Sequence, residues 1–400
     1  MLPVHKKAWV RTVVPVTATR IEPHEVPQEA TLVAQERTLN KAKNSMGEVY
    51  DRNHGLAERI RRSMDFYGGA FKEQLAKEYG IKHGSNAWLK CWELLHLFVL
   101  PALKSAPSIQ HFTSLHIAEF PGSFVLATRH FVKALPGLLG RAITDDWFAS
   151  SYYIANQNNT FLGDNYGLWR DHRAQWLMDG REQIGDVRLR RTIEYHELRL
   201  REAGARINFV TSDLAMDADN FDHLEQVNVR ADFGAFVLAL CCLAITPEAD
   251  VPQVMALKFF SFLTPFNCDL LAYASAKFAH VHLVKPLSSR PLNSETYLIG
   301  VGFKGLDANE REWLLRLLDR AEREPEFAAN MWKYSWVTGP PPTQPAALSV
   351  LKPLYMDQIQ HLDFFSRSAA RGGSDARTLA PTAEAAHRDW LRLYADGLRV

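Results

Sequence analysis

The sequence predicts an α/β fold in which helices cover both faces of a mostly parallel β-sheet. Through the middle of the chain, short runs of β-branched and aromatic residues alternate with helical segments, and this order is typical of parallel strands joined by helical crossovers. The 400 residues are 47% hydrophobic and 23% charged, which is ordinary composition for a globular protein. One late connection is too short for a crossover, so we expect the last strand to be antiparallel.

The elements are expected in the following order. Residues 1 to about 30 are rich in Pro and Val and lack helical periodicity, which indicates an extended arm; helical periodicity then runs, with breaks, from Thr31 to about Leu103. Strands are predicted at Ser114–Ala118, Asp146–Tyr152, Ile207–Thr211, Val254–Phe260, His280–Val284 and Thr296–Gly302. Helices are predicted at Ser123–Leu135, Arg188–Ala203, Asp232–Ile245, Pro265–Phe278, Asn309–Glu324 and Tyr355–Phe365, with a stiff segment at Gly339–Pro342 before the last of these.

The connection between the last two strands decides where several charged residues meet. Only Lys285 to Glu295 separate these strands, and a parallel pair needs a dozen or more residues for its crossover. The final strand should therefore form a hairpin, and its start should lie at the edge where the parallel strands end. Asp213 follows one of these strands and Lys258 lies late in another. Ligands bind at this edge in open α/β sheets, so we expect three charged residues to converge there.

Composition and targeting signals limit the remaining possibilities. The formal net charge of +1 gives no global basicity, although a local basic patch for nucleic acid is still possible. The four cysteines lie in apolar surroundings without metal-ligand spacing, which favours reduced core thiols and no metal site. No signal segment opens the chain, and the apolar run Phe233–Ile245 is too short to span a bilayer. We expect a nuclear or cytoplasmic protein with no membrane partner.

Four charged residues stand out from their local context. Lys90 lies on an apolar helical stripe and Lys258 lies inside an apolar strand, where an unpaired charge is costly. Taken alone, Lys90 is more simply explained by snorkelling to water, and Lys258 can also be a strand-end lysine that reaches water. Asp213 is as easily explained by capping a helix, and Glu295 by a solvated turn. Together, two lysines and two carboxylates in a partly dry site can activate a poorly acidic hydroxyl for group transfer, since burial and a second ammonium lower the pKa of a lysine.

A tight turn upstream suits a small ligand. Glu119 to Phe124 follows a predicted strand and opens a helix, and Pro121-Gly122 allows the backbone to approach a ligand closely. Many α/β turns carry Pro-Gly without a ligand, so this signal is weak by itself. The turn lacks the Gly-Lys-Ser/Thr of a phosphate-binding P-loop and lacks a dinucleotide fingerprint.

These blocks together resemble a known family. The segment Leu115–Phe124 is similar to motif I of the FtsJ-like ribose 2′-O-methyltransferases, and the segments Leu257–Phe266 and Val284–Tyr297 look like the mRNA cap enzymes of that superfamily. The segments Leu39–Asn44 and Ala87–Lys90 are similar to the cap enzymes that act on the second transcribed nucleotide. The resemblance covers roughly residues 39 to 305. It implies a Rossmann-like class I methyltransferase fold with a seven-stranded sheet and helical extensions at both ends.

The resemblance also implies a division into regions and a set of site residues. It implies an amino-terminal arm and helical region at 1–105, a methyltransferase core at 106–305 and a helical extension at 306–400. The family's Lys-Asp-Lys-Glu tetrad falls on Lys90, Asp213, Lys258 and Glu295, with Lys258 as the base toward a ribose 2′-hydroxyl. S-adenosylmethionine would be the methyl donor, with contacts from Glu119, Pro121, Gly122, Ser123, Phe124 and, at the adenine, Asp186. Phe120 and Thr211-Ser212-Asp213-Leu214 depart from the family pattern, and Asn156 or Asn158 would have to hold the donor's ribose.

The implied partner is the 5′ end of a capped RNA, with capping-machinery proteins as possible further partners. Cations near phosphates would contact the RNA, and the candidates are Arg290, Lys285, Arg61 and Arg62. Tyr67, Trp169, Trp332 and Trp336 are candidates for stacking a methylated guanine. Two alternatives stay open: a ribosomal or transfer RNA 2′-O-methyltransferase with the same tetrad, and a catalytically inactive RNA-binding scaffold of the same fold.

Overall fold

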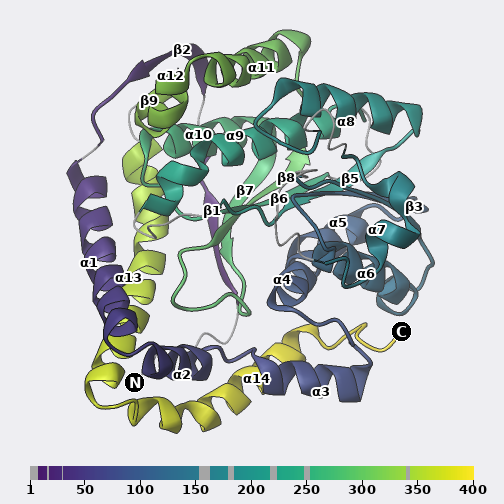
Figure 1. Ribbon diagram of the computed structural model, residues 1–400. Helices are drawn as coiled ribbons and strands as arrows, with labels where there is room; N and C mark the ends of the chain where they lie inside the picture. Colours follow the sequence, from purple (N-terminus) through teal and green to yellow (C-terminus); the bar gives the residue numbers. More distant parts are fainter. Residues whose placement is uncertain are drawn as a thin grey trace.

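The computed structural model confirms the predicted α/β architecture. A central sheet lies between two layers of helices, and further helices frame it at both chain ends (Figure 1). The structure describes residues 8–15, 18–28, 30–152, 163–178, 184–216, 223–246, 253–338 and 343–400. The Gly339–Pro342 segment lies outside the described residues.

The main sheet has seven strands among the described residues, in the order β1-β7-β8-β6-β5-β3-β4. The strands are β1 (Trp9–Val13), β3 (His111–Ile117), β4 (Thr144–Ala149), β5 (Ile207–Ser212), β6 (Val254–Phe259), β7 (Phe278–Lys285) and β8 (Thr296–Phe303). Strands β4, β3, β5 and β6 are mutually parallel. Strand β8 runs antiparallel to both β6 and β7, as the short connection before it predicts.

Helices pack against each face of this sheet and at its ends. The helices are α1 (Ala30–Arg52), α2 (His54–Met64), α3 (Gly69–Tyr79), α4 (Asn86–Leu94), α5 (Leu100–Ser105), α6 (Ser123–Leu139), α7 (Leu168–Asp171), α8 (Arg190–Glu202), α9 (Leu224–Leu243), α10 (Pro265–Lys277), α11 (Ala308–Arg323), α12 (Pro325–Asn330), α13 (Thr343–Ala370) and α14 (Ala380–Tyr394). A π-helical segment, η1 (Leu95–Val99), joins α4 to α5. The short 3₁₀ segments are η2 (Arg173–Gln175), η4 (Met331–Lys333) and η5 (Asp375–Leu379).

Two hydrophobic cores occupy the two faces of the sheet, and each strand contributes alternate side chains to the two cores. In β6, Met255 and Leu257 belong to the core that contains α9 and α10, whereas Val254 and Ala256 belong to the core that contains α4, α6 and α14. Side chains in a strand alternate between faces, so Lys258 follows Ala256 onto the face that α4 covers. This alternation is what directs a strand lysine toward a helix lysine.

The amino-terminal arm is more ordered than the sequence predicts. Strand β1 extends the main sheet by pairing antiparallel with β7, with Trp9 opposite Lys285. Strand β2 (Thr19–Glu25) pairs with β9 (Tyr334–Thr338) in a separate two-stranded sheet. Both partners lie more than two hundred residues away in the chain, so the local sequence shows only that the arm is extended.

Helix α9 is long and apolar enough to cross a membrane by its length and composition, and 83% of its most apolar window is buried inside the fold. It begins at Leu224, earlier than predicted, because Leu224–Arg230 continue the helix with polar residues. Its central residues pack in the core beside β5 and β6, so α9 is a core helix here.

Candidate active site

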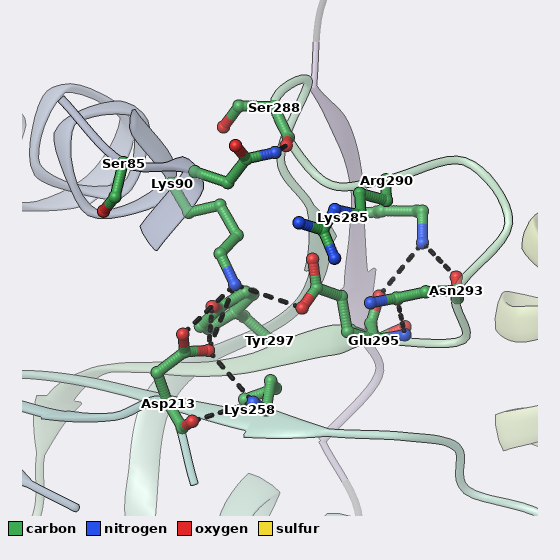
Figure 2. Close-up of polar contacts among 12 residues, drawn as sticks. Ser85, Lys90, Asp213, Lys258, Lys285, Ser288, Arg290, Asn293, Glu295 and Tyr297 are labelled. Carbon is green, nitrogen blue, oxygen red and sulfur yellow. Dashed lines mark hydrogen bonds and ion pairs between the residues drawn. The ribbon is translucent and has the colours of Figure 1, made fainter. Parts of the chain in front are cut away.

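Four charged side chains from separate elements meet at one edge of the sheet. The Nζ atom of Lys90 lies 3.2 Å from Oδ1 of Asp213 and 3.1 Å from Oε2 of Glu295. The Nζ atom of Lys258 lies 3.3 Å from Oδ1 of Asp213 and donates a 2.7 Å hydrogen bond to its backbone carbonyl. Figure 2 shows both lysines pointing toward the Asp213 carboxylate, with Glu295 beside Lys90. The structure therefore brings the predicted tetrad together.

Local structure explains why each of the four side chains points inward. Lys90 lies on α4, which is capped by Ser85, whose hydroxyl accepts the Trp88 N–H at 3.0 Å. Every residue of α4 from Trp88 to Leu94 is buried, so Lys90 cannot reach water by snorkelling and needs a partner. Asp213 comes directly after β5 and Glu295 directly before β8. The hairpin topology thus delivers Glu295 to the edge at which β5 and β6 end.

Charge compensation, and not solvent, keeps this network ionised. Burial by itself disfavours the ammonium of Lys90, but the carboxylates of Asp213 and Glu295 outweigh it and raise the pKa of Lys90. Burial disfavours both carboxylates as well, and the lysines outweigh it and hold the pKa of Asp213 and of Glu295 below the ordinary values. Lys90 is therefore fixed as an ammonium between two carboxylates. Lys258 contacts one carboxylate and one carbonyl.

Tyr297 belongs to the same network and was not singled out from the sequence. It lies opposite Lys258 in the β6–β8 register, and its hydroxyl donates a 2.6 Å hydrogen bond to Oδ1 of Asp213. Lys90 Nζ lies 5.5 Å from the centre of its ring, which also stacks on Phe124 of α6. The sequence held one signal: in an antiparallel strand that starts after Glu295, residue 297 faces the same side.

Hydrogen bonds between the two ends of the β7–β8 loop hold the backbone around Glu295 in place. Lys285 Nζ donates hydrogen bonds of 2.6 Å to the Asn293 carbonyl and 3.3 Å to the Glu295 carbonyl. Asn293 Oδ1 accepts the Glu295 N–H at 2.6 Å, as Figure 2 shows. Burial lowers the pKa of Lys285 to about 8. Lys285 is predicted to contact RNA, and in this structure its ammonium fixes the backbone around Glu295.

The predicted donor turn lies next to this network. Oε1 of Glu119 accepts the Phe124 N–H at 2.5 Å and the Val125 N–H at 3.4 Å, so Glu119 caps the start of α6. Burial raises the pKa of Glu119 to about 8. Ser123 Oγ accepts a 3.0 Å hydrogen bond from Ser85, which links the turn to the helix that carries Lys90.

Gly122 is required in this turn for two reasons. Its φ angle is +117°, which disfavours other residues, and a Cβ there would lie 2.3 Å from Cδ1 of Leu168. Pro121 follows a cis peptide bond. The turn is therefore a tight backbone feature at the end of β3, with Leu168 packed directly against Gly122.

Asp186 lies in a second turn, between the end of β4 and helix α8. A Cβ on its neighbour Gly185 would lie 2.1 Å from the Ser151 carbonyl, so this turn packs directly on the chain after β4. Asp186 Oδ1 accepts the Arg188 N–H at 3.0 Å, and Oδ2 pairs with the Arg188 guanidinium at 2.8 Å. Its role at an adenine stays a prediction. Asn156 and Asn158 lie outside the described residues.

The predicted RNA contacts gather where α2 ends beside the β7–β8 loop. Arg290 is half exposed and lies 3.5 Å from Asp65, the residue that ends α2. Arg61 forms hydrogen bonds of 2.8 Å to both oxygens of Glu58, whereas the side chain of Arg62 is 78% exposed. Arg290 and Arg62 therefore present charge to solvent more freely than Arg61 does.

Two of the four candidate aromatic residues are core residues. Trp336 is fully buried and Tyr67 is 5% exposed. Trp169 faces the Arg173 guanidinium at 4.1 Å, and Trp332 lies 5.1 Å from the Lys333 ammonium. A cation of this chain thus already lies near the ring of Trp169 and of Trp332, and base stacking by either residue stays a prediction.

A large cavity of about 1610 Å³ lies between β1, α13, α14 and the β7–β8 loop. Lys285 and Ser289 line it, whereas none of the four tetrad residues does. The charged network is therefore not part of this cavity, and the loop borders both.

Comparison with known proteins places these observations in a family. The FtsJ-like methyltransferase family model matches residues 85–303. An uncharacterised protein of Acanthamoeba polyphaga mimivirus is 29% identical over 266 residues, which cover 65% of this chain and 31% of that protein. A probable methyltransferase of African swine fever virus is 28% identical over 249 residues, which cover 60% of this chain and 54% of that protein.

A relative named for an activity on capped mRNA is also similar. The cap-specific mRNA (nucleoside-2′-O-)-methyltransferase 2 of Danio rerio is 25% identical over 314 residues, which cover 75% of this chain and 38% of that protein. The aligned part of this chain thus spans from about a third to about half of the length of these relatives.

Proposed function

The chain belongs to the FtsJ-like methyltransferase family, and we propose that it transfers a methyl group from S-adenosylmethionine to the ribose 2′-hydroxyl of a 5′-proximal nucleotide of capped mRNA. The observation that carries the proposal is the contact of Lys90 and Lys258 with one carboxylate, Asp213, at 3.2 and 3.3 Å. A ribose hydroxyl is poorly acidic, and a neutral lysine amine held beside a carboxylate can accept its proton. The name of the zebrafish relative supports capped mRNA as the substrate.

The unequal surroundings of the two lysines support Lys258 as the base. Lys90 lies between two carboxylates that raise its pKa, so it holds its proton and contributes positive charge. Lys258 contacts one carboxylate and the Asp213 carbonyl. A neutral Lys258 amine would take the proton of the 2′-hydroxyl and become an ammonium, while Asp213 and Tyr297 hold the Lys90 charge in place.

The residues at the donor turn fit a nucleoside-type methyl donor. The tight turn at Gly122 follows β3, and the buried carboxyl of Glu119 lies there with Ser123 at the start of α6. When bound, S-adenosylmethionine supplies a methyl group on a sulfonium. Glu119, Gly122 and Ser123 would hold and orient it, and Asp186 would bind its adenine.

Cap dependence tests the proposal directly. Purified protein is given labelled S-adenosylmethionine and two RNAs of one sequence, one with a 5′ cap and one with a 5′ triphosphate. We expect methyl transfer to the capped RNA to be at least about tenfold faster than transfer to the triphosphate RNA. A tenfold preference corresponds to a cap contact that contributes about 1.4 kcal/mol. Equal transfer to both RNAs would support a ribosomal or transfer RNA enzyme instead. RNA binding without transfer to any RNA would support an inactive scaffold.

A further inference from the structure

One carboxylate outside the tetrad connects three distant segments. Glu93 lies on α4, one helical turn after Lys90, and is fully buried. Its Oε2 accepts the Leu287 N–H at 2.6 Å, and its Oε1 accepts the Ser288 N–H at 2.9 Å. Oε1 also accepts the indole N–H of Trp390 on α14 at 2.9 Å. Glu93 thus joins the lysine helix and the carboxy-terminal helix to the first half of the β7–β8 loop.

The second half of the same loop is held from another carboxy-terminal helix. Gln358 on α13 is 2% exposed. Its Nε2 donates hydrogen bonds of 3.1 Å to the Leu292 carbonyl and 3.0 Å to Ser294 Oγ. Glu295, which pairs with Lys90, directly follows Ser294 in the chain. The contact between Gln358 and Ser294 is therefore one residue away from Glu295.

These contacts reach beyond the part of the chain that the family model matches. The match ends at residue 303, whereas α13 and α14 lie after it. Hydrogen bonds in the low-dielectric interior of a protein are electrostatically stronger than exposed ones. Contacts of this kind therefore fix where a loop lies, in addition to stabilising the fold.

We propose that Glu93 and Gln358 are positioning residues through which the carboxy-terminal helices α14 and α13 set the β7–β8 loop, and with it Glu295 and Arg290. The loop presents Arg290 to solvent next to Asp65 at the end of α2, and Figure 2 shows Arg290 on the same loop as Ser288 and Asn293. The effect on substrate rests on the proposed function. The effect on the loop itself does not.

Two matched pairs of variants test the proposal. Gln358→Leu removes both hydrogen bonds to the loop, and its control, Gln360→Leu, makes the same change at an exposed position of α13. Trp390→Phe removes the indole donor to Glu93. Its control, Trp336→Phe, removes a buried indole hydrogen bond to the Phe266 carbonyl that involves neither the loop nor α4 and α14.

Amide hydrogen exchange of residues 286–294 is measured together with kcat and with KM for capped RNA and for S-adenosylmethionine. We expect exchange to be faster and kcat/KM for RNA to fall about tenfold in Gln358→Leu and about threefold in Trp390→Phe, as for lost buried hydrogen bonds. KM for S-adenosylmethionine should not change, and the controls should behave as the unmodified protein does.

The proposal is overturned if the two test variants and their controls show the same exchange in this segment. It is also overturned if exchange rises but kcat and both KM values match those of the controls, because the helices would then hold a loop that does not serve the site. If the unmodified protein transfers no methyl group to RNA, the proposed function fails. The exchange comparison then decides by itself whether the helices position the loop.

Discussion

Two sets of buried carboxylates in this molecule have opposite surroundings. Asp213 and Glu295 face the ammonium groups of the lysines. Glu93 faces two backbone amides and an indole N–H, and Glu225 on α9 accepts the N–H groups of Leu263 and Thr264 at 2.9 to 3.0 Å. The lysines lower the pKa of the first set, whereas burial raises the pKa of the second.

The two sets of carboxylates therefore have different roles, one in the charge of the lysines and the other in the position of the backbone. A carboxylate that faces a lysine stays ionised and controls the charge and position of that lysine. A carboxylate that faces only uncharged donors fixes a stretch of backbone, as Glu225 fixes the turn between β6 and α10. Substitutions in the first set should therefore change the rate of methyl transfer, and those in the second set should change stability or loop position.

The largest expected effect is that of Lys258→Met on activity. If Lys258 accepts the hydroxyl proton, the variant loses about a thousandfold in kcat, the usual size of a general base contribution. Methyl transfer to capped RNA at saturating substrate measures it. Lys333→Met is the control, because Lys333 lies in η4 outside the network. Activity within tenfold of the unmodified protein would exclude Lys258 as the base.

A smaller loss is expected when Lys90 loses one of its two carboxylates. Glu295→Gln leaves Asp213 in contact with Lys90 at 3.2 Å, and we expect kcat to fall about a hundredfold because the buried ammonium is less well compensated. Asp213→Asn should cost more, since Asp213 contacts both lysines and Tyr297. The two variants are compared by kcat at one pH. The reverse order would contradict the central place given to Asp213.

The two sets should also respond to pH with opposite signs. The folded-state pKa of Glu93 is about 7, above its ordinary value of 4.5, so the folded state holds a proton that the unfolded state has released between these values. Its contribution to stability is present below pH 4.5 and is lost as the pH rises through 7. Glu93→Gln should flatten this fall by about 3 kcal/mol, as measured by urea unfolding at several pH values.

The tetrad carboxylates give the opposite sign at acid pH. Their folded-state pKa values are lowered, so their contribution is present above the ordinary carboxyl pKa and is lost as the pH falls through the lowered values. Glu295→Gln should therefore change the acid side of the stability profile. A change on the neutral side alone would contradict the assignment of Glu295 to the ionised set.

The smallest effect is expected for Tyr297→Phe. The variant loses the 2.6 Å hydrogen bond to Asp213 but keeps the ring against Lys90 and Phe124. We expect kcat to fall about fivefold, the cost of one buried hydrogen bond, with no change in KM for S-adenosylmethionine. A loss as large as that of Lys258→Met would mean that the hydroxyl itself takes part in proton transfer.

The sequence predicted the elements that build the sheet because their signals are local. The alternating strands and helices, and the eleven-residue span from Lys285 to Glu295, are readable without the fold. The short span was enough to predict that β8 is antiparallel and that Glu295 lies with Asp213 and Lys258. Placing Lys90 in the tetrad needed the family resemblance, because a lysine on an apolar helical stripe can also snorkel to water.

The missed features depend on contacts between distant segments. The pairing of β1 with β7 joins residues about 270 apart, and Glu93 and Gln358 look like ordinary polar positions of helices until the loop is in place. Lys285 was predicted as an RNA contact from its charge, and its bonds to the Asn293 and Glu295 carbonyls follow only from the folded hairpin. The local sequence around a residue does not show which distant residue it will contact in the fold.

Mapping the transferred methyl group tests most directly whether this network methylates a ribose 2′-hydroxyl near an mRNA cap. Capped RNA is labelled by the protein and digested with a nuclease that cannot cleave after a 2′-O-methylated nucleotide. A parallel RNA carries 2′-deoxy sugars at its first two transcribed nucleotides. We predict a labelled, nuclease-resistant 5′ fragment from the first RNA and none from the second. Label on the deoxy RNA, or label on a base in either RNA, would contradict the account.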